Sequence, residues 1–185
     1  MEKIVRKVTL TGIKPIMFDR FPGSIAKGQE LKPLEKFNFG KDGKTIVIPE
    51  INIKSFLSSQ NSESAAKRVI GRGWNSVAKA ALSFVEISPE EIPLMKNGNV
   101  LTSDSKDIQI MHHVARVKKG SLVIPQPKER PVISLPWSVS FEITLFQNKD
   151  LSEKTLRLLF EEGGLCIGLG TFRGVFGKFE VTEWK

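Results

Sequence analysis

The chain has 185 residues, of which 40% are hydrophobic and 26% charged, so it is about the size of one folded domain and wholesale disorder is excluded. No apolar run approaches the roughly 20 residues needed to cross a bilayer, and the N-terminal segment lacks the apolar stretch of a secretion signal. A single cysteine, Cys166, excludes an internal disulfide and a cysteine-based zinc site, and its apolar neighbours predict a buried, inert thiol. We therefore expect one cytoplasmic domain over residues 1–185, with no metal and no cofactor.

The charge balance points to an anionic partner. Lysine and arginine number 28 against 20 acidic residues, which gives a net charge of +8. Excess positive charge attracts polyanions at long range, and nucleic acid is the commonest polyanion of the cytosol. No segment combines a basic helical face with a large aromatic one, so a membrane surface is not the expected partner.

The N-terminal segment predicts a strand, a loop and a hairpin. Apolar and polar residues alternate from Ile4 to about Met17, although Arg6 falls on the apolar face. Residues 19–33 are polar and carry glycine and proline, which predicts a long loop. Two short apolar runs around a glycine-containing turn then predict an inserted hairpin over about residues 34–49.

Two helices and a short strand are expected next. Apolar residues recur at helical spacing over 53–57 and again over 74–81. Gly71 and Gly73 lie between these stretches and make one continuous helix unfavourable. Residues 84–87 predict a short strand.

The second half predicts strands and a basic arm. Residues 108–117 form an expected strand, and residues 118–130 form an expected basic arm with a short apolar middle. Residues 137–145 alternate strictly between apolar and polar side chains, which is typical of an antiparallel strand with one solvated face. Trp74 and Trp137 are expected in the core.

A helix and a last strand complete the pattern. Asp150 is expected to cap the helix with Glu153 in its first turn, and Gly163–Gly164 are expected to end it. A final strand follows from Phe179. The element order is βαββαβ, which predicts an α+β fold of the ferredoxin-like (RRM-like) kind with inserted hairpins.

The segment between that helix and the last strand is unusually rich in glycine, with six glycines over residues 163–179. Glycine allows positive φ and close approach of another chain, and exposed N–H groups there would cradle a phosphate beside Arg173. The alternative is a glycine-rich turn that packs the helix against the strand. The spacing fits neither a dinucleotide-binding fingerprint nor a P-loop.

This segment resembles the C-terminal glycine-rich loop of the RAMP superfamily, the ferredoxin-like subunits of CRISPR effector complexes, through the pattern Gly168-x-Gly170-x-x-Arg173-x-x-x-Gly177-x-Phe179. Residues 10–17, Ile48–Pro49, and Arg130–Pro131 ahead of Trp137 are similar to small RAMP-like proteins of phages and prophages. The resemblance implies a domain that grips single-stranded RNA or DNA by its backbone, with a thumb-like hairpin and copies stacked along the strand. A phage-encoded relative would work in the host cytoplasm.

The leading hypothesis is therefore a non-catalytic single-strand-binding protein that self-associates along its ligand. The predicted contacts are Gly168, Gly170, Arg173 and Gly174 of the loop, Lys118, Lys119, Lys128 and Arg130 of the arm, Lys67, Arg68 and Arg72 near a helix end, and Trp184 for stacking on a base. The helix macrodipole alone would also explain the cations near the helix end.

Two other functions stay open at this point. His112 and His113 are neighbours on an expected strand and point to opposite faces, so they cannot jointly hold a metal. Either one could act as general acid or base in a metal-independent endoribonuclease of the CRISPR-processing type. The other alternative is a phage counter-defence factor that binds a nucleotide ligand or a protein through the glycine-rich loop.

Overall fold

The computed structural model describes residues 2–20, 30–60 and 62–185, and the side chains of residues 117–119 are outside this description. Helices pack on antiparallel sheets, which confirms the α+β class. Most of the expected loop over residues 19–33 lies outside the described residues. Within the described part, no helix is long and apolar enough to cross a membrane.

The central sheet has the strand order β12–β1–β11–β5, and every neighbouring pair is antiparallel. Its strands are β1 (Lys3–Gly12), β5 (Val85–Ser88), β11 (Ser138–Phe146) and β12 (Phe179–Trp184). The short strands β7 (Met95–Lys96) and β8 (Asn99–Val100) continue the sheet beside the start of β11. The expected strands at both ends of the chain are confirmed.

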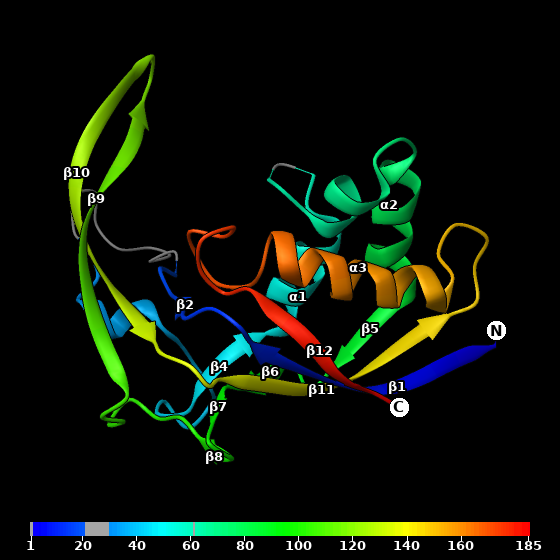
Figure 1. Cartoon of the computed structure of the whole chain (residues 1–185), viewed down its shortest axis with the longest axis horizontal. Coiled ribbons are helices and arrows are strands. Elements are labelled where there is room, and N and C mark those ends of the chain that lie inside the picture. The colour runs from blue at the N-terminus through cyan, green and yellow to red at the C-terminus, as the bar shows by residue number, and fades with distance from the viewer. Residues whose placement is uncertain (1, 21–29, 61) are drawn as a thin grey trace.

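The helices lie together on one face of this sheet (Figure 1). They are α1 (Glu50–Ser58), α2 (Trp74–Phe84) and α3 (Glu153–Cys166). A π-helical turn, η2 (Ala66–Ile70), separates α1 from α2, and Gly71 and Gly73 follow it with positive φ. Two separate helices were expected here, and the glycines supply the break.

Successive side chains of β11 point alternately to the helix-covered face and to the open face of the sheet. Val139, Phe141, Ile143 and Leu145 are buried under the helices, and Trp137 just before the strand is 1% exposed. The other face carries Thr9, Thr11 and Ser140 across its centre, linked by hydroxyl hydrogen bonds to neighbouring strands. Arg6 falls on the helix-facing side because its guanidinium donates to the Glu153 carboxylate at the start of α3, at 2.6 Å.

The boundaries of α3 differ from the expected ones. Ser152, rather than Asp150, caps the helix, and its Oγ accepts the N–H of Thr155 at 3.1 Å. Gly163 and Gly164 lie inside the helix, which continues to Cys166. A Cβ on Gly164 would come within 2.6 Å of the Phe179 carbonyl oxygen, so this glycine permits close packing of α3 on β12 instead of ending the helix.

The first strand is shorter than expected because the chain turns at Gly12. A Cβ there would collide with the Trp137 indole at 2.2 Å, and β1 ends at this contact. The following strand β2 (Ile16–Met17) belongs to a different sheet. The expected strand through Met17 is therefore two strands in two sheets.

The expected hairpin near residues 34–49 is confirmed in part by a small sheet. After the 3₁₀ turn η1 (Pro33–Lys36), β3 (Asn38–Phe39) pairs with β4 (Ile46–Pro49), and β4 also pairs with β6 (Glu91–Pro93). This sheet leads directly into α1.

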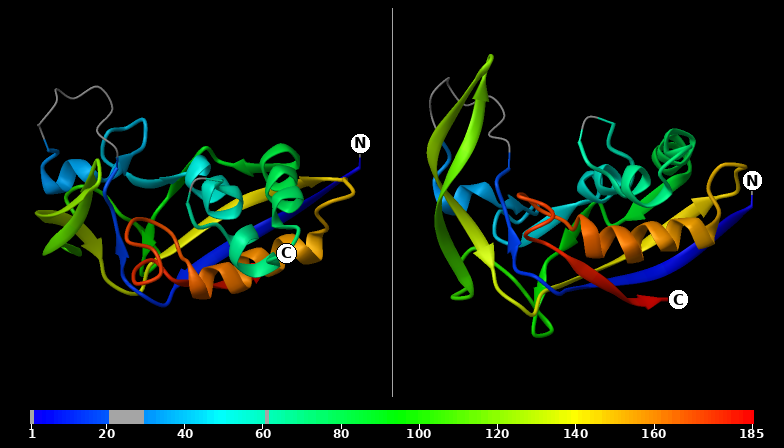
Figure 2. Two further views of the ribbon diagram at one scale, coloured as in Figure 1. Left: turned by 90° about the horizontal axis from the view of Figure 1, so that it is seen from above. Right: turned by 45° about the horizontal axis from the view of Figure 1, so that its top comes forward.

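A long hairpin projects from the body of the molecule (Figures 1 and 2). Its strands β9 (Ile108–Lys119) and β10 (Leu122–Ile133) pair over their whole length, and the base of β10 also pairs with β2. We call this hairpin the arm. The segment expected as a basic arm, residues 118–130, is the tip and most of the second strand of this longer structure.

Candidate nucleic-acid interface

The glycine-rich loop between α3 and β12 is folded tightly on itself. Gly168, Gly170, Gly174 and Gly177 all have positive φ. The loop's N–H groups largely serve its own fold: Leu169 donates to the Gly177 carbonyl, Gly174 to that of Ile167, Thr171 to that of Met17, and Gly177 to that of Pro15. These four amides are therefore occupied, and the expected phosphate cradle is not formed by them.

Arg173 projects from this loop toward the segment that precedes η2. Its guanidinium donates to Ser62 Oγ at 3.1 Å and to the Glu63 carbonyl at 3.0 Å. Burial lowers the pKa of Arg173 from its ordinary range, and the nearby Glu63 carboxylate opposes this effect. Arg173 thus joins the loop to the helical layer, and the guanidinium is only partly exposed.

The cations near η2 have local partners. Lys67 donates to two backbone carbonyls and lies 5.0 Å from the centre of the Trp74 ring. Arg68 pairs with Glu63 at 3.2 Å, with both side chains well exposed, while Arg72 is exposed in the turn before α2. Of these expected cations, Arg68 is connected to Arg173 through Glu63, whose carbonyl accepts from Arg173.

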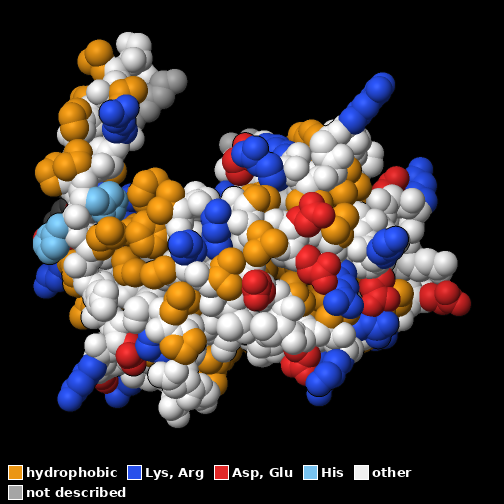
Figure 3. Space-filling model, in the orientation of Figure 1, with side chains coloured by type: hydrophobic (Ala, Val, Ile, Leu, Met, Phe, Trp, Pro, Cys, Tyr) orange, Lys and Arg blue, Asp and Glu red, His pale blue; other side chains and the backbone are white. Residues whose placement is uncertain are grey.

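The outer part of the arm is apolar along its described residues. Leu122 is 66% exposed, Val114 64% and Val123 59%, and Figure 3 shows apolar side chains running along the projection. Arg116 is an exposed cation on this part of β9. Lys118 and Lys119 belong to β9, but their side chains lie outside the described part of the structure.

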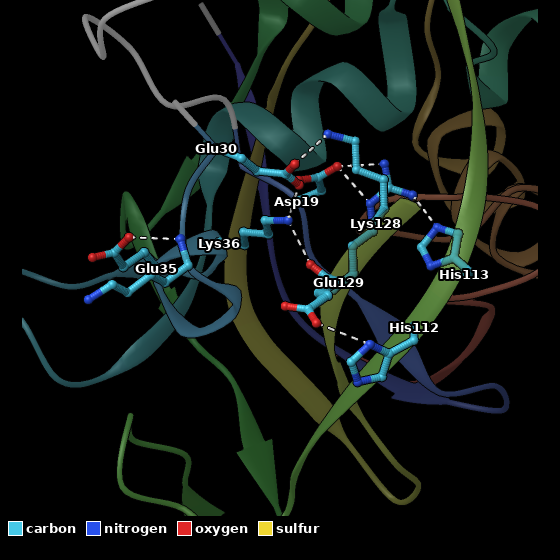
Figure 4. Close-up of polar contacts among 10 residues, drawn as sticks. Asp19, Glu30, Glu35, Lys36, His112, His113, Lys128 and Glu129 are labelled. Carbon is cyan, nitrogen blue, oxygen red and sulfur yellow. Dashed lines mark hydrogen bonds and ion pairs between the residues drawn. The ribbon is translucent and has the colours of Figure 1, made fainter. Parts of the chain in front are cut away.

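The two remaining arm cations are held at its base. Lys128 pairs with Glu30 at 3.0 Å, and the same carboxylate pairs at 2.6 Å with Lys36, which is only 2% exposed (Figure 4). Lys36 also donates to the Glu129 carbonyl on the arm. Because the Glu30 carboxylate holds both ammonium groups and the Lys128 side chain is only 17% exposed, Lys128 secures the arm and is not the open basic contact that the sequence suggested.

Arg130 is also engaged within the protein. It donates to the Asp19 carboxylate at 2.6 Å, where the two side chains are 15% and 25% exposed, and another of its N–H groups donates to Nε2 of His113 at 2.6 Å. Since an arginine N–H only donates, Nε2 of His113 must be unprotonated. The contact therefore requires neutral His113.

The two histidines point to opposite faces of the arm, as expected. His112 is exposed and pairs with Glu129 at 3.1 Å. His113 faces the glycine-rich loop, and its ring lies nearly parallel to that of Phe172, at 9° with centroids 6.1 Å apart. The Phe172 ring also stacks with the ring of Phe176 in the same loop. Through Phe172, the aromatic side chains of the loop are thus in contact with His113 on the arm.

Stability should fall in mild acid because of His113. Burial lowers its pKa from the ordinary value of 6.5, and the Arg130 and Lys36 cations lower it further, while the Met111 carbonyl and the Asp19 carboxylate oppose them. Below pH 6.5 the unfolded chain therefore binds more protons at this histidine than the folded chain does. The stability that neutral His113 contributes is fully present above pH 6.5 and is lost as the pH falls through its lowered pKa in the folded chain. Thermal unfolding from pH 7.5 to 5.5 should show a steeper loss for the natural protein than for His113→Gln, and equal loss in both would contradict this role.

A cleft of about 420 Å³ lies beside the glycine-rich loop. It is bounded by the segment after β2, by β3, by α1 and by the loop, and its lining residues include Arg20, Asn38, Asn52, Ser55, Thr171, Phe172 and Arg173. Asp19 and Gly170 also line it. The cleft therefore borders the base of the arm through Asp19 and Phe172.

Sequence reasoning missed Phe172. It has a positive φ of 54° and is 54% exposed, which is unusual for a bulky residue. The only signal was an aromatic side chain within a glycine-rich segment. Trp184, which was expected to be exposed for stacking, instead packs on Phe160 and donates to Glu153 at 3.1 Å.

Cys166 is exposed, so the expectation of a buried thiol is wrong. It is the last residue of α3, and the turn that follows directs Ile167 into the core in its place. Partial desolvation raises the pKa of the Cys166 thiol, which makes it a weak nucleophile.

The architecture defines an α+β protein with a helical layer on an antiparallel sheet and a projecting hairpin. No family model matches the chain, and no curated protein matches it in sequence. The fold is similar to that of a solved structure, a chain from the cryo-EM structure of the Type III-B Cmr-beta bound to cognate target RNA. The TM-score is 0.52 and the sequence identity is 14%. The match covers 99% of this chain and 60% of that chain. At this identity the likeness shows the fold.

Proposed function

We propose that this protein binds single-stranded RNA without cleaving it, and that it holds the strand along the cleft between the glycine-rich loop and the base of the arm. The observation that carries the proposal is the cleft itself, which has Arg20 and Arg173 in its lining and an exposed aromatic ring, Phe172, beside them. Arginine suits phosphate oxygens, and aromatic rings suit unstacked bases.

The topology supports a RAMP-like protein. The central sheet is built mainly from β1, β5, β11 and β12, named in chain order, with helices between β1 and β5 and between β11 and β12. In the sheet these strands have the order β12–β1–β11–β5, which is fourth, first, third, second. This order supports our proposal of a ferredoxin-like βαββαβ domain, in which the arm would be inserted between the second and third strands. The structurally similar chain comes from an assembly bound to target RNA, which favours RNA as the ligand here.

The position of the site differs from that of an RRM. RRM domains stack bases on aromatic side chains of the open sheet face. Here the centre of that face carries hydroxyl groups, including those of Thr9, Thr11 and Ser140. The cleft at the edge of the helical layer is the better RNA site because it combines arginines, amides and an aromatic ring.

The arm has the form of a thumb. Its exposed Leu122, Val123 and Val114 would lie against unstacked bases, and Arg116 would meet the backbone where the strand leaves the cleft and passes the arm, because Val114 and Arg116 share the face of His112. Several copies along one strand would give each arm a neighbouring molecule to contact, and this would cover apolar surface that is exposed in a single copy. Assembly along RNA is therefore part of the proposal.

Catalysis is not part of it. His113 is held as a neutral acceptor of Arg130, and His112 pairs with Glu129 on the opposite face of the arm, away from Phe172. Neither histidine combines exposure with a position in the cleft.

The test is binding and integrity of labelled RNA. Single-stranded RNA should bind more tightly than a duplex of the same length, because the cleft takes unpaired bases, and it should stay intact on incubation in chelator. His112→Ala should bind as the natural protein does. Discrete cleavage products that disappear in His112→Ala or His113→Ala would establish an endoribonuclease instead, and equal binding of duplex and single strand would contradict the cleft.

A further inference from the structure

The cleft is lined mainly by neutral polar side chains. Asn38 comes from β3, Asn52 and Ser55 from α1, and Thr171 from the glycine-rich loop. Among the described residues, none of these four side chains makes a hydrogen bond to another residue. Four groups of this kind around one cavity are available for a ligand.

Helical geometry explains why two of them point into the cleft. Asn52 and Ser55 are three residues apart and so share one face of α1. Ile53 and Phe56 are fully buried on the adjacent face of the helix, where they fix its rotation against the core. The polar face of α1 is therefore held toward the cleft by packing, and the site is built on a rigid element.

The charged side chains of the cleft lining are Asp19, Arg20 and Arg173, which leave an excess of positive charge beside its neutral side chains. The Asp19 carboxylate is already paired with Arg130, and Arg173 is tied to Ser62 and Glu63 at the rim. An asparagine amide offers a donor and an acceptor together, which matches the edge of a base. The amides of Asn38 and Asn52 therefore suit the edge of a base, while Arg20 and Arg173 of the same lining suit the phosphates on either side of it.

Phe172 supplies a ring at the same site. Its left-handed backbone conformation is unfavourable for a bulky residue, and such strain is typically retained at functional positions. The ring is nearly parallel to that of His113, at 9°, and is also stacked with that of Phe176, at 29°, while the side chain is still 54% exposed. The ring is thus oriented by the arm and open to a ligand.

We propose that the cleft takes one unstacked base of the bound strand, whose edge is read by the amides of Asn52 and Asn38 and whose face contacts Phe172. The inference rests on the proposed function and adds a base preference to otherwise backbone-directed binding. The volume of about 420 Å³ lies within the range of roughly 300–1,000 Å³ that is usual for small-ligand sites.

The experiment compares the affinities of three fluorescein-labelled RNA dodecamers, oligo(A), oligo(C) and oligo(U), for the full chain and its variants. The natural protein should prefer one of them by about tenfold, the range of one good base contact. Asn52→Ala should abolish the preference and leave the affinity for the weakest dodecamer unchanged. Phe172→Leu should weaken all three by about tenfold through loss of stacking.

Asn75→Ala is the matched control, because Asn75 is also an exposed asparagine in the first turn of a helix but lies outside the cleft. It should keep the preference, and all variants should keep the natural melting temperature. Equal affinities for the three dodecamers, or a preference that survives Asn52→Ala, would overturn the base site while leaving RNA binding in place. Failure of the natural protein to bind any of the dodecamers would overturn the proposed function itself.

Discussion

Replacing Gly177 by alanine should lower the free energy of unfolding by about 2–5 kcal/mol. The backbone at Gly177 has a φ of 71°, where an L-residue costs roughly 1–2 kcal/mol. A Cβ there would also lie 1.8 Å from the Leu169 carbonyl oxygen, so the loop must shift, and such overpacking costs about 1–3 kcal/mol more. Chemical denaturation monitored by tryptophan fluorescence measures this loss.

Gly174→Ala separates the two causes. Gly174 has a φ of 88°, but a Cβ would meet nothing closer than the Cys166 carbonyl oxygen at 4.0 Å. This variant should lose only the conformational part, about 1–2 kcal/mol. Equal losses of unfolding free energy in Gly174→Ala and Gly177→Ala would show that the close contact at Gly177 adds nothing to the cost of the substitution.

Arg130→Met should lower the free energy of unfolding by about 2–3 kcal/mol, and it should weaken RNA binding per folded molecule only through the Asp19 carboxylate that it leaves unpaired in the cleft lining. Removal of one partner of a buried ion pair costs about 3–5 kcal/mol, and the partial exposure of Arg130 and Asp19 reduces this figure. His113 also loses its donor. Methionine retains most of the aliphatic packing, so the loss reports the charge. Equilibrium unfolding and RNA titration of the same preparation measure both quantities.

Two further variants serve as controls for Arg130→Met. In the double variant Asp19→Asn with Arg130→Met, part of the stability should return because no carboxylate is left without a partner. Arg116→Met removes an exposed arm cation and should change the free energy of unfolding by less than about 0.5 kcal/mol while weakening RNA binding. If Arg130→Met weakens RNA binding and does not affect stability, Arg130 is a ligand contact and the assignment at the base of the arm is wrong.

Much of the fold was accessible from sequence because it depends on periodicity. The alternation in β11 and the helical spacing in α1 and α2 reflect burial on one side, and both are local properties of the chain. The turn at Gly12 was not accessible, since it is caused by the Trp137 indole more than a hundred residues away. The same holds for Gly163 and Gly164, which look like a helix end but serve close packing of α3.

The candidate site was less accessible because charge in a sequence carries no information on pairing. Lys128 and Arg130 resemble a basic contact, but in the folded chain they pair with Glu30, which also holds Lys36, and with Asp19. The glycine-rich loop was identified correctly as a distinctive element, but the N–H groups of Leu169, Thr171, Gly174 and Gly177 bond within the protein. The cleft is formed by residues from four separate segments, and no local pattern in the sequence brings those segments together.

The most direct test of the central claim is the salt dependence of affinity for the single-stranded RNA used above. Each phosphate contact contributes roughly 0.7 to the slope of log affinity against log salt for a single strand. Contacts along the cleft and the arm should give three or more, and therefore a slope steeper than about −2, with a shallower slope in Arg116→Met by roughly 0.7. Measurable binding with a slope near zero, or no binding to the single strand at low salt, would contradict the account.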